Sequence, residues 1–207
     1  MTKESGTIPN PSGVQQRKRL AWGPIVAIVL LVTAVGGIVG LHQPHAMSVG
    51  GSFELINTKN GSLVTDRDLR GKWLVVFFGY THCPDVCPTT LGAIADAMAK
   101  LGPLADRVQP LFITLDPIRD TQQALTDYSV AFEPRIIALT GSPDQIAVAA
   151  KAYRIYYATR VVGDDYYVDH TAVIHVMRPD GSYATSLLSS SDSTEIVRSL
   201  RSFLGAG

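Results

Sequence analysis

The only two cysteines of the 207-residue chain lie in the stretch Thr-His-Cys-Pro-Asp-Val-Cys-Pro, at residues 81–88. Cys83 follows a predicted buried strand, and Cys87 is four residues further on, which is the same face of a helix. The first turn of a helix has unpaired N–H groups and the positive end of the dipole, and both favour a thiolate. Two such thiols can close a disulfide or bind one soft metal ion, such as Cu(I).

A purely structural disulfide is the simplest alternative if the domain is exported, as the N-terminal sequence indicates below. A bridge that closes so short a loop adds little chain-entropy stabilisation. Pro84 and Pro88 already stiffen this segment. We therefore favour a redox-active or metal-binding pair.

The elements that must position the cysteines alternate between strand and helix. The continuous apolar run 73–78 predicts a strand buried on both faces, and apolar residues recur at helical spacing over 87–101. The same patterns predict strands at 111–115 and 135–139, helices at 121–130, from Ser142-Pro143 onward and at 192–204, and hairpins at 53–64 and at 166–177 with 183–188. This order predicts an α/β fold, a thioredoxin-like sandwich with a mixed sheet and one inserted helix–strand unit.

If the thiols bind a metal, two thiolates alone do not discriminate which metal it is, and a further ligand would come from another part of the chain. An imidazole added to two thiolates permits Cu(II) as well as Cu(I). His82 points away from Cys83 if the segment is extended, whereas His170 lies at the entrance to the last hairpin, which runs beside the cysteine helix in a thioredoxin-like sheet. Without the cysteines, His170 would be interpreted as a surface-loop histidine. A thiol reductase of thioredoxin type carries a cis-proline at this entrance, but no proline occurs between Pro143 and Pro179, which favours a metal site.

The N-terminal part of the chain predicts a transmembrane helix. Residues 21–41 carry no charge and are long enough to cross a hydrocarbon core of about 30 Å, and the basic residues 17–19 precede them. By the positive-inside rule, residues 1–20 form a disordered cytoplasmic tail, 42–50 a stalk, and 51–207 a domain outside the cytoplasmic membrane, in the periplasm where one exists. A cleaved signal peptide is the alternative, and it would export the same domain.

Composition excludes several classes of protein. The chain has 18 Lys+Arg and 18 Asp+Glu, so it lacks the basic excess that nucleic-acid binding requires. With 46% hydrophobic and 17% charged residues, it is not a mainly disordered chain. Two cysteines are too few for a disulfide scaffold or an all-cysteine zinc site.

Three separated stretches resemble the Sco/SenC family of copper-binding, thioredoxin-like proteins. They are Phe78–Pro88, Leu115–Thr121, and Asp169–Thr171 followed by Arg178–Gly181, so the resemblance covers about residues 50–205. It implies that Cys83, Cys87 and His170 bind copper, as Cu(I), Cu(II) or both. It also implies a membrane-anchored metallochaperone that assists assembly of the CuA site of cytochrome c oxidase. The expected partner is the CuA-bearing subunit or another copper protein.

Two enzymatic alternatives use the same thiols. Cys83 and Cys87 can act as a thiol–disulfide oxidoreductase on the cysteines of a copper protein, because only reduced thiolates bind metal. A thiol peroxidase is a third possibility, although the sequence has no dedicated peroxide-site signature. We expect a metallochaperone rather than an enzyme.

The remaining polar candidates are expected to be structural. Asp116, Arg119 and Asp120, in the second resembling stretch, are expected to form a turn and to cap the helix at Thr121 rather than to bind metal. The other histidines are expected in the stalk or in a strand; they are His42, His45 and His175.

Overall fold

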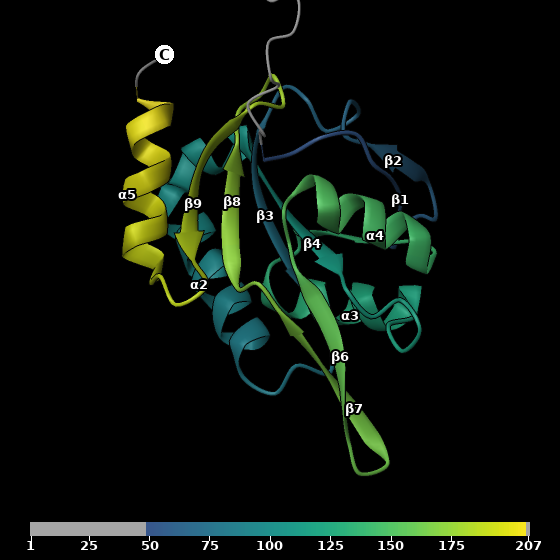
Figure 1. The fold of residues 1–207 in the computed structure, drawn as a ribbon. Coiled ribbons are helices and arrows are strands. Elements are labelled where there is room, and N and C mark those ends of the chain that lie inside the picture. The colour runs from purple at the N-terminus through teal and green to yellow at the C-terminus, as the bar shows by residue number, and fades with distance from the viewer. Residues whose placement is uncertain (1–48, 206–207) are drawn as a thin grey trace, which may run out of the picture. The chain divides into compact units, whose positions relative to one another are not determined.

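The computed structural model describes residues 49–205 and builds them around one mixed sheet (Figure 1). Seven strands lie in the order β2-β1-β5-β4-β3-β8-β9. Their bounds are β1 (Glu54–Asn57), β2 (Leu63–Thr65), β3 (Trp73–Gly79), β4 (Val108–Thr114), β5 (Ile137–Thr140), β8 (Val173–Met177) and β9 (Tyr183–Leu188). The helices are α2 (Val86–Leu101), the short 3₁₀ helix η1 (Gly102–Arg107), α3 (Gln122–Phe132), α4 (Pro143–Ala152) and α5 (Ser193–Leu204).

Strand β3 lies inside the sheet, between β4 and β8, and is buried at all seven positions, as its continuous apolar run predicts. It pairs in parallel with β4 and antiparallel with β8. Its side chains alternate between the two faces: Val75 and Phe77 pack with residues of α2 and α5, whereas Val76 and Phe78 pack with residues of α4. Because both faces are covered, the carboxyl end of β3 is held rigidly where the cysteine segment begins.

Three of the predicted helix starts are confirmed by their caps. The side chain of Thr121 accepts a hydrogen bond from the backbone N–H of Ala124 at the start of α3. Ser142 and Gln145 form a reciprocal capping box at the start of α4. Asp192 caps α5. The hairpin predicted at 53–64 is present as β1 and β2.

The prediction of one strand over 166–177 is wrong. The structure divides this segment into β7 (Asp165–His170) and β8, which pair with different partners. β7 pairs with β6 (Tyr157–Val162), a strand that the sequence patterns did not predict, and this hairpin extends away from the body of the domain (Figure 1). The segment breaks at 171–172, where the Thr171 N–H bonds to the Tyr156 carbonyl at 2.9 Å. His170 therefore lies at the junction between the hairpin and the sheet.

The predicted cytoplasmic tail and membrane anchor (1–20 and 21–41) lie outside the described residues, as does most of the predicted stalk. None of the helices between residues 49 and 205 is both long and apolar enough to cross a membrane.

Candidate metal centre

The cysteine segment is a tight connection between β3 and α2. Cys87 is fully buried in the first turn of α2, and Cys83 is half-buried just before the helix. The Asp85 side chain at the N-cap makes no capping hydrogen bond. Instead the backbone N–H of Cys87 donates to Cys83 Sγ at 3.4 Å, so a sulfur takes the place of the usual capping oxygen.

Gly79, the last residue of β3, makes room for the buried sulfur. A Cβ atom at this position would lie 2.6 Å from Cys87 Sγ and 3.0 Å from Phe112 Cε2. Non-bonded heavy atoms pack best at about 3.5–4.0 Å. A glycine is therefore required here for the close approach of strand and thiol rather than for an unusual backbone angle.

The two thiols differ in acidity. A hydrogen bond from Cys87 lowers the pKa of Cys83 to about 4, although burial opposes this shift. The pKa of Cys87 is raised far above its ordinary value, because its thiol donates to Cys83 and is buried. Both cysteines are free. The pair thus consists of a half-exposed thiolate at Cys83 and a buried protonated thiol at Cys87.

His170 comes to the cysteines from the end of β7. Its Nε2 atom lies 3.9 Å from Cys87 Sγ, and its Nδ1 atom lies 3.1 Å from the Thr171 carbonyl oxygen. Because a carbonyl oxygen can only accept, Nδ1 carries the proton and the Nε2 lone pair is directed toward the sulfur side. The rings of Phe77 and Tyr80 make edge contacts with the imidazole, at centroid distances of 6.4 Å and 6.3 Å.

The structure therefore brings together the three side chains expected to bind metal. Between residues 49 and 205, however, no group of three or more His, Cys, Asp or Glu side chains is arranged to hold a metal ion as it stands. The other histidines lie elsewhere. His82 Nδ1 is 3.0 Å from Thr81 Oγ1 and 3.7 Å from Asp120 Oδ1, and His175 is buried in β8 beside Ser186. His42 and His45 lie outside the described residues.

The expectation that Asp120 helps to cap α3 is wrong, because Thr121 alone provides that cap. The Asp120 carboxylate is buried and instead accepts hydrogen bonds from the Thr81 hydroxyl at 2.5 Å, the Thr81 N–H at 3.1 Å and the Thr114 hydroxyl at 2.6 Å. Asp120 thus fastens the segment that leads into Cys83. Thr81 and Asp120 are 39 positions apart, so no local pattern in the sequence could have linked them.

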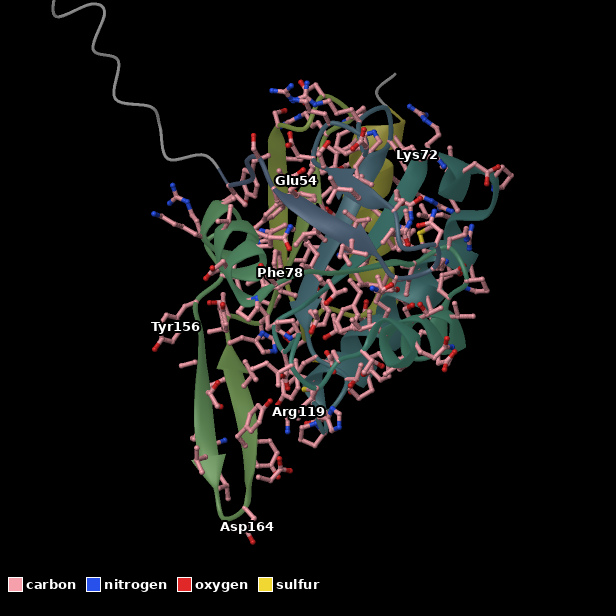
Figure 2. The ribbon with its side chains drawn as sticks, turned by 90° about the vertical axis from the view of Figure 1, so that its right-hand side faces the viewer. Glu54, Lys72, Phe78, Arg119, Tyr156 and Asp164 are labelled. Atoms are coloured by element: carbon pink, nitrogen blue, oxygen red, sulfur yellow. The ribbon has the colours of Figure 1, made fainter. Side chains whose placement is uncertain are left out.

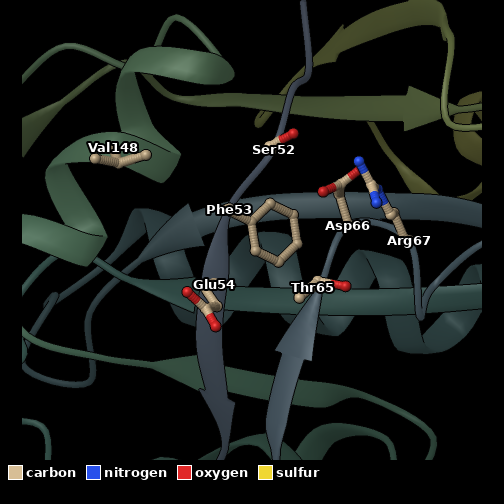
Figure 3. Close-up of a pocket in the computed structure, with 7 residues that line it drawn as sticks. All are labelled: Ser52, Phe53, Glu54, Thr65, Asp66, Arg67 and Val148. Carbon is tan, nitrogen blue, oxygen red and sulfur yellow. The ribbon is translucent and has the colours of Figure 1, made fainter.

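A larger pocket lies elsewhere. It has a volume of about 460 Å³ and is lined by Ser52, Phe53, Glu54, Thr65, Asp66, Arg67 and Val148, a set without cysteine or histidine (Figure 3). A smaller groove of about 310 Å³ runs beside Cys83 and His170, between the start of α2 and the hairpin. The chemistry of the side chains, rather than the size of the cavity, identifies this smaller groove as the candidate site.

A family model described as SCO1/SenC matches residues 42–205. The chain belongs to the SCO1/SenC family. It is 43% identical over 138 residues to "Protein SCO1 homolog 1, mitochondrial" of Arabidopsis thaliana, an alignment that covers 66% of this chain and 41% of the relative. The chain therefore spans less than half the length of that relative.

Solved structures of SCO1/SenC proteins confirm the thioredoxin-like α/β fold. Bradyrhizobium japonicum ScoI, solved with copper bound, is 39% identical with a TM-score of 0.70, over 75% of this chain and 99% of that chain. BsSco is 20% identical with a TM-score of 0.60, over 77% of this chain and 95% of that chain, and supports the fold alone. Its structure is described as that of a member of the Sco family of cytochrome c oxidase assembly proteins with a disulfide switch.

Proposed function

We propose that this chain is a copper metallochaperone that binds copper as cargo through Cys83, Cys87 and His170. The observation that carries the proposal is the 3.9 Å separation of His170 Nε2 and Cys87 Sγ. Bonds from zinc to sulfur and to nitrogen are about 2.3 Å and about 2.0 Å long. With similar bond lengths and an angle of about 120° at the metal, a sulfur and a nitrogen bound to the same ion lie about 3.7 Å apart. A small movement of the His170 ring would therefore complete a site with both sulfurs.

The donor set favours copper over harder metals. Thiolates are soft ligands that select Cu(I), and an imidazole also suits Cu(II). The hydrogen bond from Nδ1 to the Thr171 carbonyl leaves Nε2 free as a donor, an arrangement typical of metal-binding histidines. Relatives solved with copper bound support the same choice.

The proposed recipient is the CuA-bearing subunit of cytochrome c oxidase or another copper protein. The description of the Sco family as cytochrome c oxidase assembly proteins supports this choice. The uncharged run at 21–41 would hold the domain at the extracytoplasmic face of the membrane, in the periplasm where one exists, close to a membrane-bound recipient. Oxidation of the two thiols to a disulfide would remove both thiolate donors, so copper loading would require the reduced protein.

The unequal acidity of the cysteines favours thiol–disulfide oxidoreductase activity as the second candidate. The Cys83 thiolate would attack a disulfide of the recipient, form a mixed disulfide and release one recipient thiolate. Cys87 would then attack Cys83 Sγ and pass its proton to the departing recipient sulfur, which leaves as the second recipient thiol. The chain ends as the Cys83–Cys87 disulfide and the recipient as a dithiol, so two electrons pass to the recipient.

A His170→Ala variant separates the two functions. Loss of a residue that only supports a metal ligand typically lowers metal affinity about 10–100-fold, and the copper affinity of His170→Ala should fall by more than that. Its thiols should still reduce a model disulfide. His82→Ala is the matched control, since this neighbouring histidine faces Asp120 and should leave copper binding unchanged. Cys83→Ser should abolish both activities. Unchanged copper affinity in His170→Ala, with loss confined to the cysteine variants, would contradict the proposed site and favour the reductase.

A further inference from the structure

The hairpin that carries His170 is not part of the main sheet, and Arg119 holds it against the body. Arg119 Nη1 donates to Asp165 Oδ1 at 2.9 Å and to the Tyr166 carbonyl at 3.0 Å, at the start of β7. Its guanidinium carbon lies 3.6 Å from the centroid of the Tyr166 ring. Figure 2 shows Arg119 on the body beside the hairpin, whose far end is marked by Asp164. Arg119 thus binds β7 by charge, by hydrogen bonds and by stacking.

A carboxylate on the body fixes Arg119 in turn. Asp116 Oδ2 accepts from Arg119 Nε at 2.5 Å, and Asp116 Oδ1 accepts from the Tyr166 hydroxyl at 2.9 Å. The Asp116 side chain is 3% exposed and that of Arg119 is 18% exposed, so solvent weakens this pair less than it weakens a surface ion pair. Asp116, Arg119 and Tyr166 therefore form a closed triangle between the β4–α3 turn and β7.

This triangle determines where His170 can lie. Alternate residues of a strand face the same side, so Tyr166 and His170 both point toward the body from β7, with buried Val168 between them. Tyr80 bridges the two regions, with its ring centroid 5.9 Å from the Arg119 guanidinium and 6.3 Å from the imidazole. A hairpin released at Tyr166 would pivot at the 171–172 break and carry His170 away from the sulfurs.

The same turn also fixes the cysteine segment. Asp120, adjacent to Arg119 in the sequence, holds Thr81 through the hydrogen bonds described above. The backbone N–H of Asp120 bonds to the Asp116 carbonyl at 3.0 Å, which closes the turn on itself. One five-residue turn therefore contacts both halves of the metal centre, at Thr81 and at Tyr166.

We propose that Arg119 is a positioning residue that sets the distance of His170 from the cysteine pair by clamping β7 to the Asp116–Asp120 turn. The inference rests on the proposed copper site, but its structural part concerns the metal-free protein. Arg119 itself contacts no metal ligand. Losing its two charge-assisted hydrogen bonds to β7 should free the hairpin.

The test compares Arg119→Ala with Arg160→Ala in the full-length protein. Arg160 is a matched control, because it pairs with Asp169 at 2.9 Å within the same hairpin, so its loss leaves the contacts of β7 with the Asp116–Asp120 turn in place. In the metal-free protein, hydrogen exchange of the β7 amides should become at least about tenfold faster in Arg119→Ala and remain unchanged in Arg160→Ala. With added Cu(II), the hyperfine signal from the His170 nitrogen should be weakened or lost in Arg119→Ala alone, while the thiolate-to-copper absorption band persists.

Asp165→Asn covers the case in which Arg119→Ala does not fold. Asp165 is 70% exposed, and its replacement by Asn removes only the negative charge of one partner of Arg119, so a smaller acceleration of β7 exchange is expected. Unchanged β7 exchange in the folded variants, or equal acceleration in Arg160→Ala, would overturn the proposal even if copper binds as proposed. Failure of the wild-type protein to bind copper would refute the proposed function, while the exchange experiment would still decide whether Arg119 positions the hairpin.

Discussion

Replacing Gly79 by alanine should destabilise the domain through the cysteine pair. The added Cβ would meet Cys87 Sγ at 2.6 Å, Phe112 Cε2 at 3.0 Å and Phe77 Cε1 at 3.3 Å. Against an optimal separation of about 3.5–4.0 Å, the contact with sulfur is too short by about 1 Å. The strand and the helix on either side are both buried, so neither can move away without disturbing the core.

The size of the effect follows from two opposing contributions. Overpacking a closely packed core costs about 1–3 kcal/mol, whereas replacing a strand glycine by alanine recovers roughly 0.5–1 kcal/mol of backbone entropy. We expect a net loss of about 1–2 kcal/mol in the free energy of unfolding. For a domain of this size, that lowers the melting temperature by roughly 2–8 °C.

Urea unfolding of the domain from Met47 to Gly207, a separate compact unit, measures this loss. Gly92→Ala is the matched control, because nothing lies within 4 Å of its added Cβ and alanine favours a helix by about 1 kcal/mol. In the double variant Gly79→Ala/Cys87→Ala, removal of the sulfur should recover part of the loss, which a double-mutant cycle would quantify. If Gly79→Ala is as stable as Gly92→Ala, the tight contact between strand and thiol does not exist.

Three further predictions follow from the same features. Oxidation of Cys83 and Cys87 to a disulfide should abolish Cu(I) binding and reduction should restore it, measured as copper per chain after gel filtration; full copper retention after oxidation would place the ligands elsewhere. Burial lowers the pKa of His175 below 6.5, so the folded domain takes up a proton there less readily than the unfolded chain, and stability should fall as the pH drops below about 6.5. Urea unfolding at several pH values should show that His175→Gln loses less free energy of unfolding at low pH than the wild-type protein does. Equal losses in the two proteins would show that other groups cause the pH dependence. Protease added to spheroplasts should digest the domain beyond residue 41, and a fully protected domain would contradict the proposed topology.

Local patterns predicted most of the fold and the cysteine pair, because these depend on neighbouring residues. His170 lies 83 positions from Cys87 and was proposed from the expected topology and from the family resemblance. The apolar run of β3 and the helical spacing around Cys87 are both local signals. Strand β6 was missed, because its last four residues are exposed and it pairs outside the main sheet. The sequence nevertheless contains a strand signal there, because β-branched residues precede Gly163, a turn residue with a φ of 62°.

The supporting residues could not be predicted from the sequence. Asp120 contacts Thr81 across 39 positions, and Arg119 contacts Asp165 across 46. A short acidic and basic stretch between a strand and a helix indicates a turn, and the sequence alone supports no stronger statement. Only the folded chain shows that this turn lies between the cysteine segment and the hairpin.

X-ray absorption spectroscopy of the reduced, Cu(I)-loaded protein tests the central claim most directly, because it counts the atoms bound to copper. We predict two sulfur atoms and one nitrogen atom per copper in the wild-type protein, and loss of the nitrogen in His170→Ala with both sulfurs retained. The His82→Ala protein should give the wild-type spectrum. A wild-type spectrum with no nitrogen ligand, or a nitrogen that persists in His170→Ala, would contradict the proposed site.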